Sequence, residues 1–148
     1  MILRCLAKDE IILATGSTLS LPDKHGFRQS PRGVARKIRI GFIGAGAMGF
    51  SHLQLFHREC RGQAKAVALC ASDPGRIARA MEVASDMRLF KNELDLIRSD
   101  LDAVVISSPN FTHVPLALEA LKAGKHIFLE KPAGITPAEC RKLLVASV

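Results

Sequence analysis

The sequence predicts an α/β domain whose sheet is parallel and doubly wound, preceded by an N-terminal arm. From residue 37 onward, short apolar runs of strand length alternate with longer segments that have helical patterning. The chain has 148 residues, of which 48% are hydrophobic and 24% charged, a composition typical of one globular domain. Right-handed strand–helix–strand connections make a sheet with the strand order 3-2-1-4-5 the expected topology.

Five apolar runs are predicted to form the strands of this sheet. The first begins at Ile38 and ends directly before a glycine-rich stretch. The others are short and carry few charges, which is typical of strands buried on both faces of a parallel sheet. The predicted strands cover residues 38–43, 66–70, 87–90, 102–107 and 126–129.

Helices are predicted between the strands from their capping residues. Asp73 can cap a helix whose first turn contains Pro74, since proline is tolerated there. Gly124 stands where a left-handed C-terminal cap belongs. Thr136, followed three residues later by Glu139, forms a capping box for the last helix. The predicted helices cover residues 47–60, 73–84, 93–98 and 112–123, with a last one that begins after Thr136.

Residues 1–36 differ from the rest and are predicted to be a flexible, basic N-terminal arm, with the domain in residues 37–148. The first part of the arm is apolar but is interrupted by three charged residues at 8–10, which does not suit a secretory signal peptide. The second part is rich in Gly, Ser, Thr, Pro and basic residues. A transit peptide and a translation start near Val34 are the two alternatives for this segment.

The net charge of +7 is concentrated at the N-terminus. Residues 1–37 hold seven Lys and Arg against three Asp and Glu, whereas residues 38–148 hold fourteen against eleven. The sequence has no long basic run, and its seven Phe are joined by no Trp or Tyr that could stack on bases. We therefore expect a solvated basic surface and no nucleic-acid partner.

Membrane-spanning and metal-binding classes are also disfavoured by the sequence. The longest apolar run, at residues 66–71, is far shorter than the ~20 residues of a membrane-spanning helix. The four cysteines at 5, 60, 70 and 140 are too far apart for a zinc-ligand motif, so no metal is expected. Cysteines without such a pattern suit a reducing, cytoplasmic setting, in which Cys70 is expected to be a small core residue.

A glycine motif joins the first predicted strand to the first predicted helix. Gly44, Gly46 and Gly49 have the spacing G-x-G-x-x-G, which is weak evidence alone and stronger directly between a strand and a helix. In a Rossmann-type fold the three glycines make the tight turn, admit a pyrophosphate close to the backbone and let the helix pack on the strand. Backbone N–H groups at the helix N-terminus then face the anion. The predicted cofactor-binding residues of this loop are Gly44, Ala45, Gly46, Ala47, Met48 and Gly49.

The choice between NAD and NADP depends on the end of the second strand. An acid there binds the ribose hydroxyls of NAD, and Asp73 falls slightly late for that position. Alternatively, Asp73 is only the cap of the next helix. Ser72 and Arg76 could instead hold the 2′-phosphate of NADP. Ser72, Asp73 and Arg76 are therefore predicted to bind the cofactor, which is NAD or NADP.

Two further groups of polar residues follow the fourth and fifth strands. Because the carboxyl ends of neighbouring parallel strands meet at one edge of the sheet, both groups are expected where ligands bind in open α/β sheets. Lys131 and His113 can transfer protons or hold a substrate anion there. A surface lysine and a histidine paired to the backbone are the alternatives. The predicted residues are Ser107, Ser108, Pro109, Asn110, His113, Glu130, Lys131 and Pro132.

Together these motifs resemble the Gfo/Idh/MocA oxidoreductases, which include glucose–fructose oxidoreductase and inositol 2-dehydrogenase. The matching stretches are IGFIGAGAMG at residues 40–49 and LDAVVISSPNFTHVPLALEALKAGKHIFLEKP at residues 101–132, and the resemblance covers most of the predicted domain. It implies that the glycine loop holds the pyrophosphate. It also implies that residues 107–113 lie under the cofactor, toward the nicotinamide.

The resemblance further implies a reaction. Glu130 and Lys131 match the family's EKP motif at the nicotinamide and the substrate. In the family that lysine contacts the reacting oxygen of the substrate or aids proton transfer, so Lys131 is the expected catalytic residue. The expected reaction is hydride exchange between C4 of the nicotinamide and a carbinol carbon of a sugar, a cyclitol or a related hydroxyl or carbonyl substrate.

This chain departs from the family in its length. The family has a second α/β domain with the substrate pocket, an Asp/His pair and the oligomer interface, whereas this chain ends at Val148 and also lacks the family's sixth strand. We therefore expect an incomplete enzyme, completed by a partner chain or a homo-oligomer, with an uncovered sheet edge and exposed apolar helix faces. The alternatives are a non-catalytic dinucleotide-binding module, a fragment of a split enzyme, and a remnant that does not fold stably.

Overall fold

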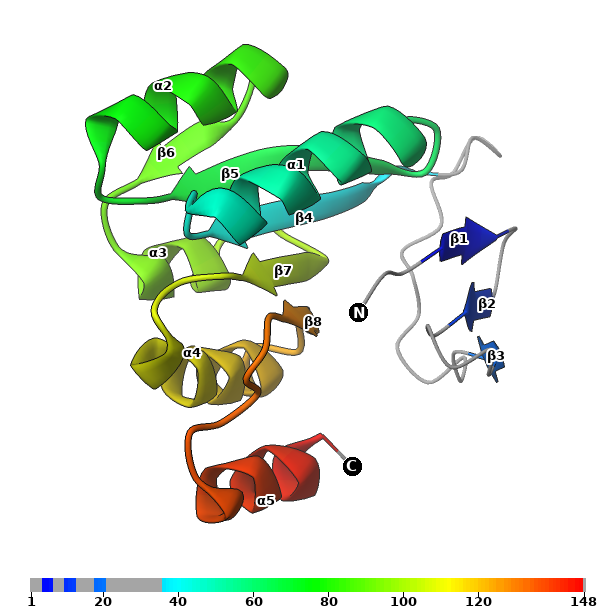
Figure 1. Ribbon diagram of the computed structural model, residues 1–148. Helices are drawn as coiled ribbons and strands as arrows, with labels where there is room; N and C mark the ends of the chain where they lie inside the picture. The colour runs from blue at the N-terminus through cyan, green and yellow to red at the C-terminus, as the bar shows by residue number, and fades with distance from the viewer. Residues whose placement is uncertain (1–3, 7–9, 13–17, 21–35, 148) are drawn as a thin grey trace. The chain divides into compact units, whose positions relative to one another are not determined.

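The computed structural model describes residues 4–6, 10–12, 18–20 and 36–147. The chain divides into two compact units, Met1–Arg36 and Lys37–Val148. The other residues of the predicted arm lie outside the described ranges, so its flexibility stays a prediction. The first unit contains three short strands that pair antiparallel in chain order (Figure 1), namely β1 (Arg4–Leu6), β2 (Glu10–Ile12) and β3 (Thr18–Ser20).

The second unit is built on a five-stranded parallel sheet. Its strand order is β6-β5-β4-β7-β8, which confirms the predicted order 3-2-1-4-5. The chain winds outward from β4 in both directions, so β4 and β7 flank the point at which the winding reverses (Figure 1). The strands are β4 (Ile38–Ile43), β5 (Ala64–Cys70), β6 (Arg88–Phe90), β7 (Ala103–Ile106) and β8 (His126–Leu129).

Helices cover both faces of this sheet, which confirms the doubly wound arrangement (Figure 1). Leu53 of α1 and Ala80 of α2 are buried with Phe42 of β4 on one face. Leu96 of α3 and Ala117 of α4 are buried on the other. The helices are α1 (Ala47–Glu59), α2 (Pro74–Val83), α3 (Glu93–Arg98), α4 (Asn110–Lys122) and α5 (Pro137–Ala146).

The predicted helix caps are present. The Asp73 side chain caps α2, and Gly124 follows α4 in the left-handed conformation, with φ +68°. Thr136 and Glu139 form the complete capping box of α5, because each accepts a hydrogen bond from the backbone N–H of the other. Cys70 is buried in the core, also as predicted.

Two elements begin earlier than the sequence predicts. β5 begins at Ala64 and not at residue 66, because its first residues pair in parallel with the start of β4. α4 begins at Asn110 and not at residue 112, with Pro109 as its N-cap. The added residues are Ala64 and Lys65 in β5, and Asn110 and Phe111 in α4. Three of the four are exposed, so they do not extend the buried apolar pattern of either element.

Candidate functional site

The glycine loop lies between the end of β4 and the start of α1 and packs against the end of β7. Gly44 has a left-handed backbone (φ +94°), and a Cβ there would lie 2.7 Å from the carbonyl oxygen of Ser107. A Cβ on Gly49 would collide with the carbonyl oxygen of Gly44 and the hydroxyl of Ser107. The packing of the chain itself therefore requires both glycines.

Gly46 differs from its neighbours because its side of the loop is open. A Cβ on Gly46 would meet only the guanidinium group of Arg76, at 3.8 Å. Gly46 is the N-cap of α1, and no side chain caps the N–H groups of that first turn. Ala45 is buried, whereas Ala47 and Met48 are exposed. An anion can therefore approach the backbone N–H groups at this helix N-terminus.

Ser72, Asp73 and Arg76 follow β5 on the side of the glycine loop. One carboxylate oxygen of Asp73 accepts a hydrogen bond from the backbone N–H of Arg76 at 2.7 Å. This bond supports the alternative that Asp73 is a helix cap. All three side chains are exposed, and the guanidinium group of Arg76 is the group that lies nearest to the open side of Gly46.

The segment after β7 supports the glycine loop and then enters α4. The Ser107 hydroxyl donates a hydrogen bond to the carbonyl oxygen of Gly44 at 3.2 Å, so it holds the glycine loop against the end of β7. The Ser108 hydroxyl is hydrogen-bonded within the first turn of α4. Pro109 and Asn110 are exposed at the start of that helix. Of these four residues, Pro109 and Asn110 are thus the most accessible to a ligand.

His113 is fully buried and links two loops. One ring nitrogen lies 2.8 Å from the carbonyl oxygen of Pro132, and the other lies 2.9 Å from the carbonyl oxygen of Ser108. This arrangement favours the alternative of a histidine paired to the backbone. His113 therefore ties the start of α4 to the segment that follows β8.

Glu130 and Lys131 begin this segment, and their side chains differ in exposure. Glu130 is buried, and its carboxylate accepts hydrogen bonds from His52 Nε2 at 2.8 Å and from the Lys131 backbone N–H at 2.9 Å. Burial would raise the pKa of this carboxyl, but the two hydrogen bonds and the charges of His52 and Lys131 outweigh it and hold the pKa below its usual value. The Lys131 side chain is exposed.

His52 is the one residue of this arrangement that sequence reasoning missed. It lies on α1, three residues after Gly49, and its ring is 4.7 Å from that of Phe128 in an edge-on contact. The signal was present, because His52 stands next to Leu53 on the helix face that the glycine motif directs toward the sheet. A polar residue on a buried helix face requires a partner, here Glu130.

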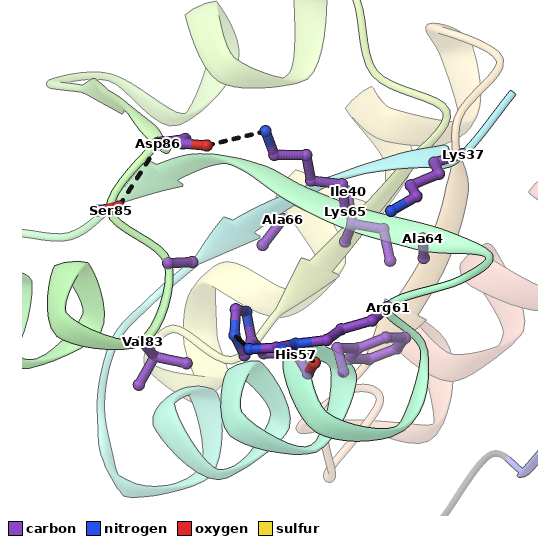
Figure 2. Close-up of a pocket in the computed structure, with 12 residues that line it drawn as sticks. Lys37, Ile40, His57, Arg61, Ala64, Lys65, Ala66, Val83, Ser85 and Asp86 are labelled. Atoms are coloured by element: carbon purple, nitrogen blue, oxygen red, sulfur yellow. Dashed lines mark hydrogen bonds and ion pairs between the residues drawn. The ribbon is translucent and has the colours of Figure 1, made fainter.

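A cavity of about 360 Å³ opens at the opposite edge of the sheet, where β4 and β5 begin (Figure 2). None of the predicted site residues lines it. Its wall includes the basic side chains of Lys37, Arg61 and Lys65, and Lys65 is paired with Asp86 at 3.1 Å.

Among the residues that the structure describes, no group of His, Cys, Asp and Glu could hold a metal ion.

Comparison with known proteins decides the family. A family model described as the oxidoreductase family with an NAD-binding Rossmann fold matches residues 38–147. This chain belongs to the Gfo/Idh/MocA family. The match covers every strand and helix of the second unit, so the Gfo/Idh/MocA domain carries both the glycine loop and the Lys131 segment.

Relatives of this Gfo/Idh/MocA domain have different names. Inositol 2-dehydrogenase of Rubrobacter xylanophilus is 40% identical over 118 residues, which is 79% of this chain and 33% of the relative. An α-N-acetylgalactosaminidase of Shewanella oneidensis is 35% identical over 118 residues, which is 72% of this chain and 25% of the relative. This chain therefore spans about a third or less of the length of these curated relatives.

Solved structures of similar fold include enzymes with bound cofactor. Scyllo-inositol dehydrogenase from Lactobacillus casei, with NAD(H) and scyllo-inositol, matches with a TM-score of 0.68 and 29% identity. The match covers 75% of this chain and 33% of that one.

In the described part of this Gfo/Idh/MocA chain, no helix has both the length and the apolar character needed to cross a membrane.

Proposed function

We propose that this chain binds a nicotinamide dinucleotide at the carboxyl ends of β4, β7 and β8 and forms the cofactor-binding part of an oxidoreductase. The open face of the loop at Gly46 carries this proposal. A backbone without a Cβ there, next to uncapped N–H groups, fits a pyrophosphate that must approach closely. The Lys131 segment follows β8 at the same edge of the sheet.

In this proposal the chain's own residues bind and orient, and one of them moves a proton. The backbone at Gly46 and the first turn of α1 hold the pyrophosphate. Asn110 and its neighbours would lie toward the nicotinamide of a bound cofactor. The exposed Lys131 ammonium would donate a proton to the substrate oxygen. When bound, the cofactor supplies a nicotinamide ring that exchanges a hydride at C4.

The substrate class that we propose is a cyclitol, a sugar or a related hydroxyl or carbonyl compound. Relatives named inositol 2-dehydrogenase and a similar structure with scyllo-inositol support a cyclitol. This chain spans about a third of their length, and we place the substrate pocket in the part of those proteins that this chain does not match. A homo-oligomer or a partner chain that contributes to this pocket is part of the same proposal, as is a cytoplasmic location.

We propose that the cofactor site accepts NADP(H) as well as NAD(H). One oxygen of the Asp73 carboxylate accepts the capping hydrogen bond from the Arg76 backbone N–H, which supports a role for this acid in capping α2 over a role in ribose binding. Arg76 and Ser72 are exposed beside this position and can hold that phosphate. Binding of NAD(H) is supported by similar structures that contain NAD(H).

Titration of the chain into NADH, and separately into NADPH, tests both proposals. The fluorescence of the cofactor reports binding, and the chain has no Trp or Tyr to interfere. We expect saturable binding of both cofactors, and Arg76→Gln to weaken NADPH about tenfold with little effect on NADH. Equal weakening of NADH and NADPH binding by Arg76→Gln would contradict the 2′-phosphate site. If the unchanged chain binds neither cofactor, the proposed function is wrong, and the chain has the Rossmann-type fold without the cofactor site.

A further inference from the structure

Three buried polar residues meet around the Lys131 segment. In the described part of the chain the buried polar or charged residues are His52, His113 and Glu130, with 8%, 1% and 7% of their surface exposed. His52 comes from α1 and His113 from α4, whereas Glu130 directly follows β8. Three separate elements therefore contribute their buried polar side chain to one place.

Both oxygens of the Glu130 carboxylate are occupied. One accepts a hydrogen bond from His52, and the other accepts one from the backbone N–H of Lys131. The Glu130 backbone is also fixed, because its N–H donates to the carbonyl oxygen of Ile106 at the end of β7, at 2.9 Å. A buried carboxylate is unfavourable unless it is satisfied in this way, and an apolar side chain would fill the same space without that cost.

The ring of His52 is held in the orientation that Glu130 needs. Phe128 of β8 contacts it edge-on at 4.7 Å, and Phe56 of α1 lies 6.3 Å from Phe128. His52 lies one turn along α1 from Gly49, whose packing against Gly44 fixes the start of the helix. The helix that presents the glycine loop is therefore the helix that presents His52.

We propose that His52 is a positioning residue for Lys131, acting through the Glu130 carboxylate. His52 and Glu130 fix the backbone on the N-terminal side of Lys131, and His113 fixes the carbonyl of Pro132 on its C-terminal side. The exposed Lys131 side chain therefore extends from a backbone segment that hydrogen bonds hold to α1 and to α4. The inference rests on the proposed function only for the role that it gives to the Lys131 ammonium.

The backbone amide of Lys131 reports this arrangement directly in the full chain. Its ¹H–¹⁵N NMR signal follows the ionisation of the carboxylate to which the N–H donates. The groups that face the carboxylate are His52 from α1 and Lys131 from its own segment. We would record this signal between about pH 3 and 7 for the unchanged chain, His52→Ala, His52→Gln and Glu130→Gln, with circular dichroism to establish folding.

We expect the midpoint of the Lys131 signal in the unchanged chain to lie below the usual value for glutamate, about 4.3. His52→Ala should raise the midpoint by about one pH unit, since burial then dominates, and His52→Gln should restore part of the difference because its amide is a neutral donor. Glu130→Gln should abolish the response. His57→Gln, on the same helix but at the opposite cavity, should leave the midpoint unchanged.

An unchanged midpoint in folded His52→Ala would overturn the inference, as would an identical shift in His57→Gln. If His52→Ala does not fold, the position of the His52→Gln midpoint relative to the unchanged chain decides the question in the same way. A parallel NADH titration separates the two proposals. Failure of the unchanged chain to bind NADH, and equally NADPH, would reject the proposed function, whereas the NMR midpoints would still decide the role of His52.

Discussion

Gly46 and Gly49 belong to one loop but lack a Cβ for different reasons. Gly49 is buried, and a Cβ there would collide with the backbone of the loop and the hydroxyl of Ser107. Gly46 has an ordinary extended backbone (φ −65°, ψ −174°), and a Cβ there would fit the folded chain. The requirement at Gly49 is therefore internal, whereas the folded chain makes no such requirement at Gly46, which suits the pyrophosphate proposed to bind there.

Adding one methyl group to each glycine should separate these two requirements. Gly49→Ala should lower the free energy of unfolding by about 1–3 kcal/mol, since the surrounding backbone must shift. Gly46→Ala should leave that free energy within about 0.5 kcal/mol but weaken NADH binding about tenfold. Urea unfolding and cofactor fluorescence measure the two quantities. Tight NADH binding by Gly46→Ala would contradict the placement of the pyrophosphate.

Lys131 differs from its buried neighbour because its side chain stays exposed while its backbone is fixed. Lys131→Met should leave the NADH affinity of this chain within about twofold, because the proposed partner of the ammonium is the substrate and not the cofactor. In an assembly that includes the substrate-binding part, turnover should fall about 10²–10⁴-fold. Lys122→Met is the matched control, since Lys122 pairs with Glu119 on α4, away from the site. Turnover that survives Lys131→Met would refute the assigned role.

At the scale of elements, α5 depends on its capping box more than on burial. No residue of α5 is fully buried; the helix packs on α4, and its half-buried Leu143 packs against the core cluster. Thr136 and Glu139 satisfy each other's backbone N–H groups, and Glu139 also accepts from Ile135 at 2.7 Å. The stability of the last helix is therefore concentrated in its first turn.

Thr136→Ala should loosen α5 without unfolding the sheet. The loss of this cap should cost the helix about 1 kcal/mol, which speeds hydrogen exchange of the α5 amides about fivefold. The exchange of the β4 amides should stay unchanged, because Leu143 is the one α5 side chain packed against the core cluster and no residue of α5 is fully buried. Thr136→Ser retains the hydroxyl and is the control, expected to exchange like the unchanged chain. Equal acceleration in β4 and α5 would show that α5 stabilises the whole unit.

The elements could be predicted wherever one residue type signals a local requirement. Asp73, Gly124 and Thr136 mark helix ends by chemistry that acts within a few residues, and each is found where the sequence places it. The start of α4 was missed by two residues, because Asn110 is polar and Phe111 is exposed, so neither belongs to the buried apolar face of the helix. The strand order followed from the alternation of strands and helices and from the handedness of their connections.

The whole second unit shows what local patterns cannot reveal. His52 and Glu130 are 78 positions apart, and only the folded sheet brings α1 and the end of β8 together. Asp73 could serve either a helix or a ribose, and its hydrogen bond to Arg76 became visible only in the structure. The sequence can therefore indicate that a buried polar residue such as His52 needs a partner, and that the glycine loop and the Lys131 segment share an edge of the sheet. It does not identify the distant partner, Glu130, or decide between two possible partners, as for Asp73.

The reactivity of the Cys70 thiol tests whether the second unit has a tightly packed core. Burial first, and the charge of Glu93 second, raise the pKa of its thiol to about 11, so the reactive thiolate is scarce at pH 8 in the folded chain. In the unfolded chain a cysteine ionises near pH 8.5. Because the unfolded state loses its proton first, the contribution of Cys70 to stability should decline as the pH rises from about 8.5 to 11.

A variant with serine at Cys5, Cys60 and Cys140 leaves Cys70 as the only thiol for this measurement. Reaction with Ellman's reagent at pH 8 should be slow in buffer and should accelerate with urea in parallel with the loss of circular dichroism. That parallel is expected because the thiol lies in the same core cluster as Leu96 and Val104, which opens only with the sheet. Fast reaction in buffer, with the helical signal intact, would instead indicate a chain that forms its helices without closing the core, as expected of a remnant that does not fold stably.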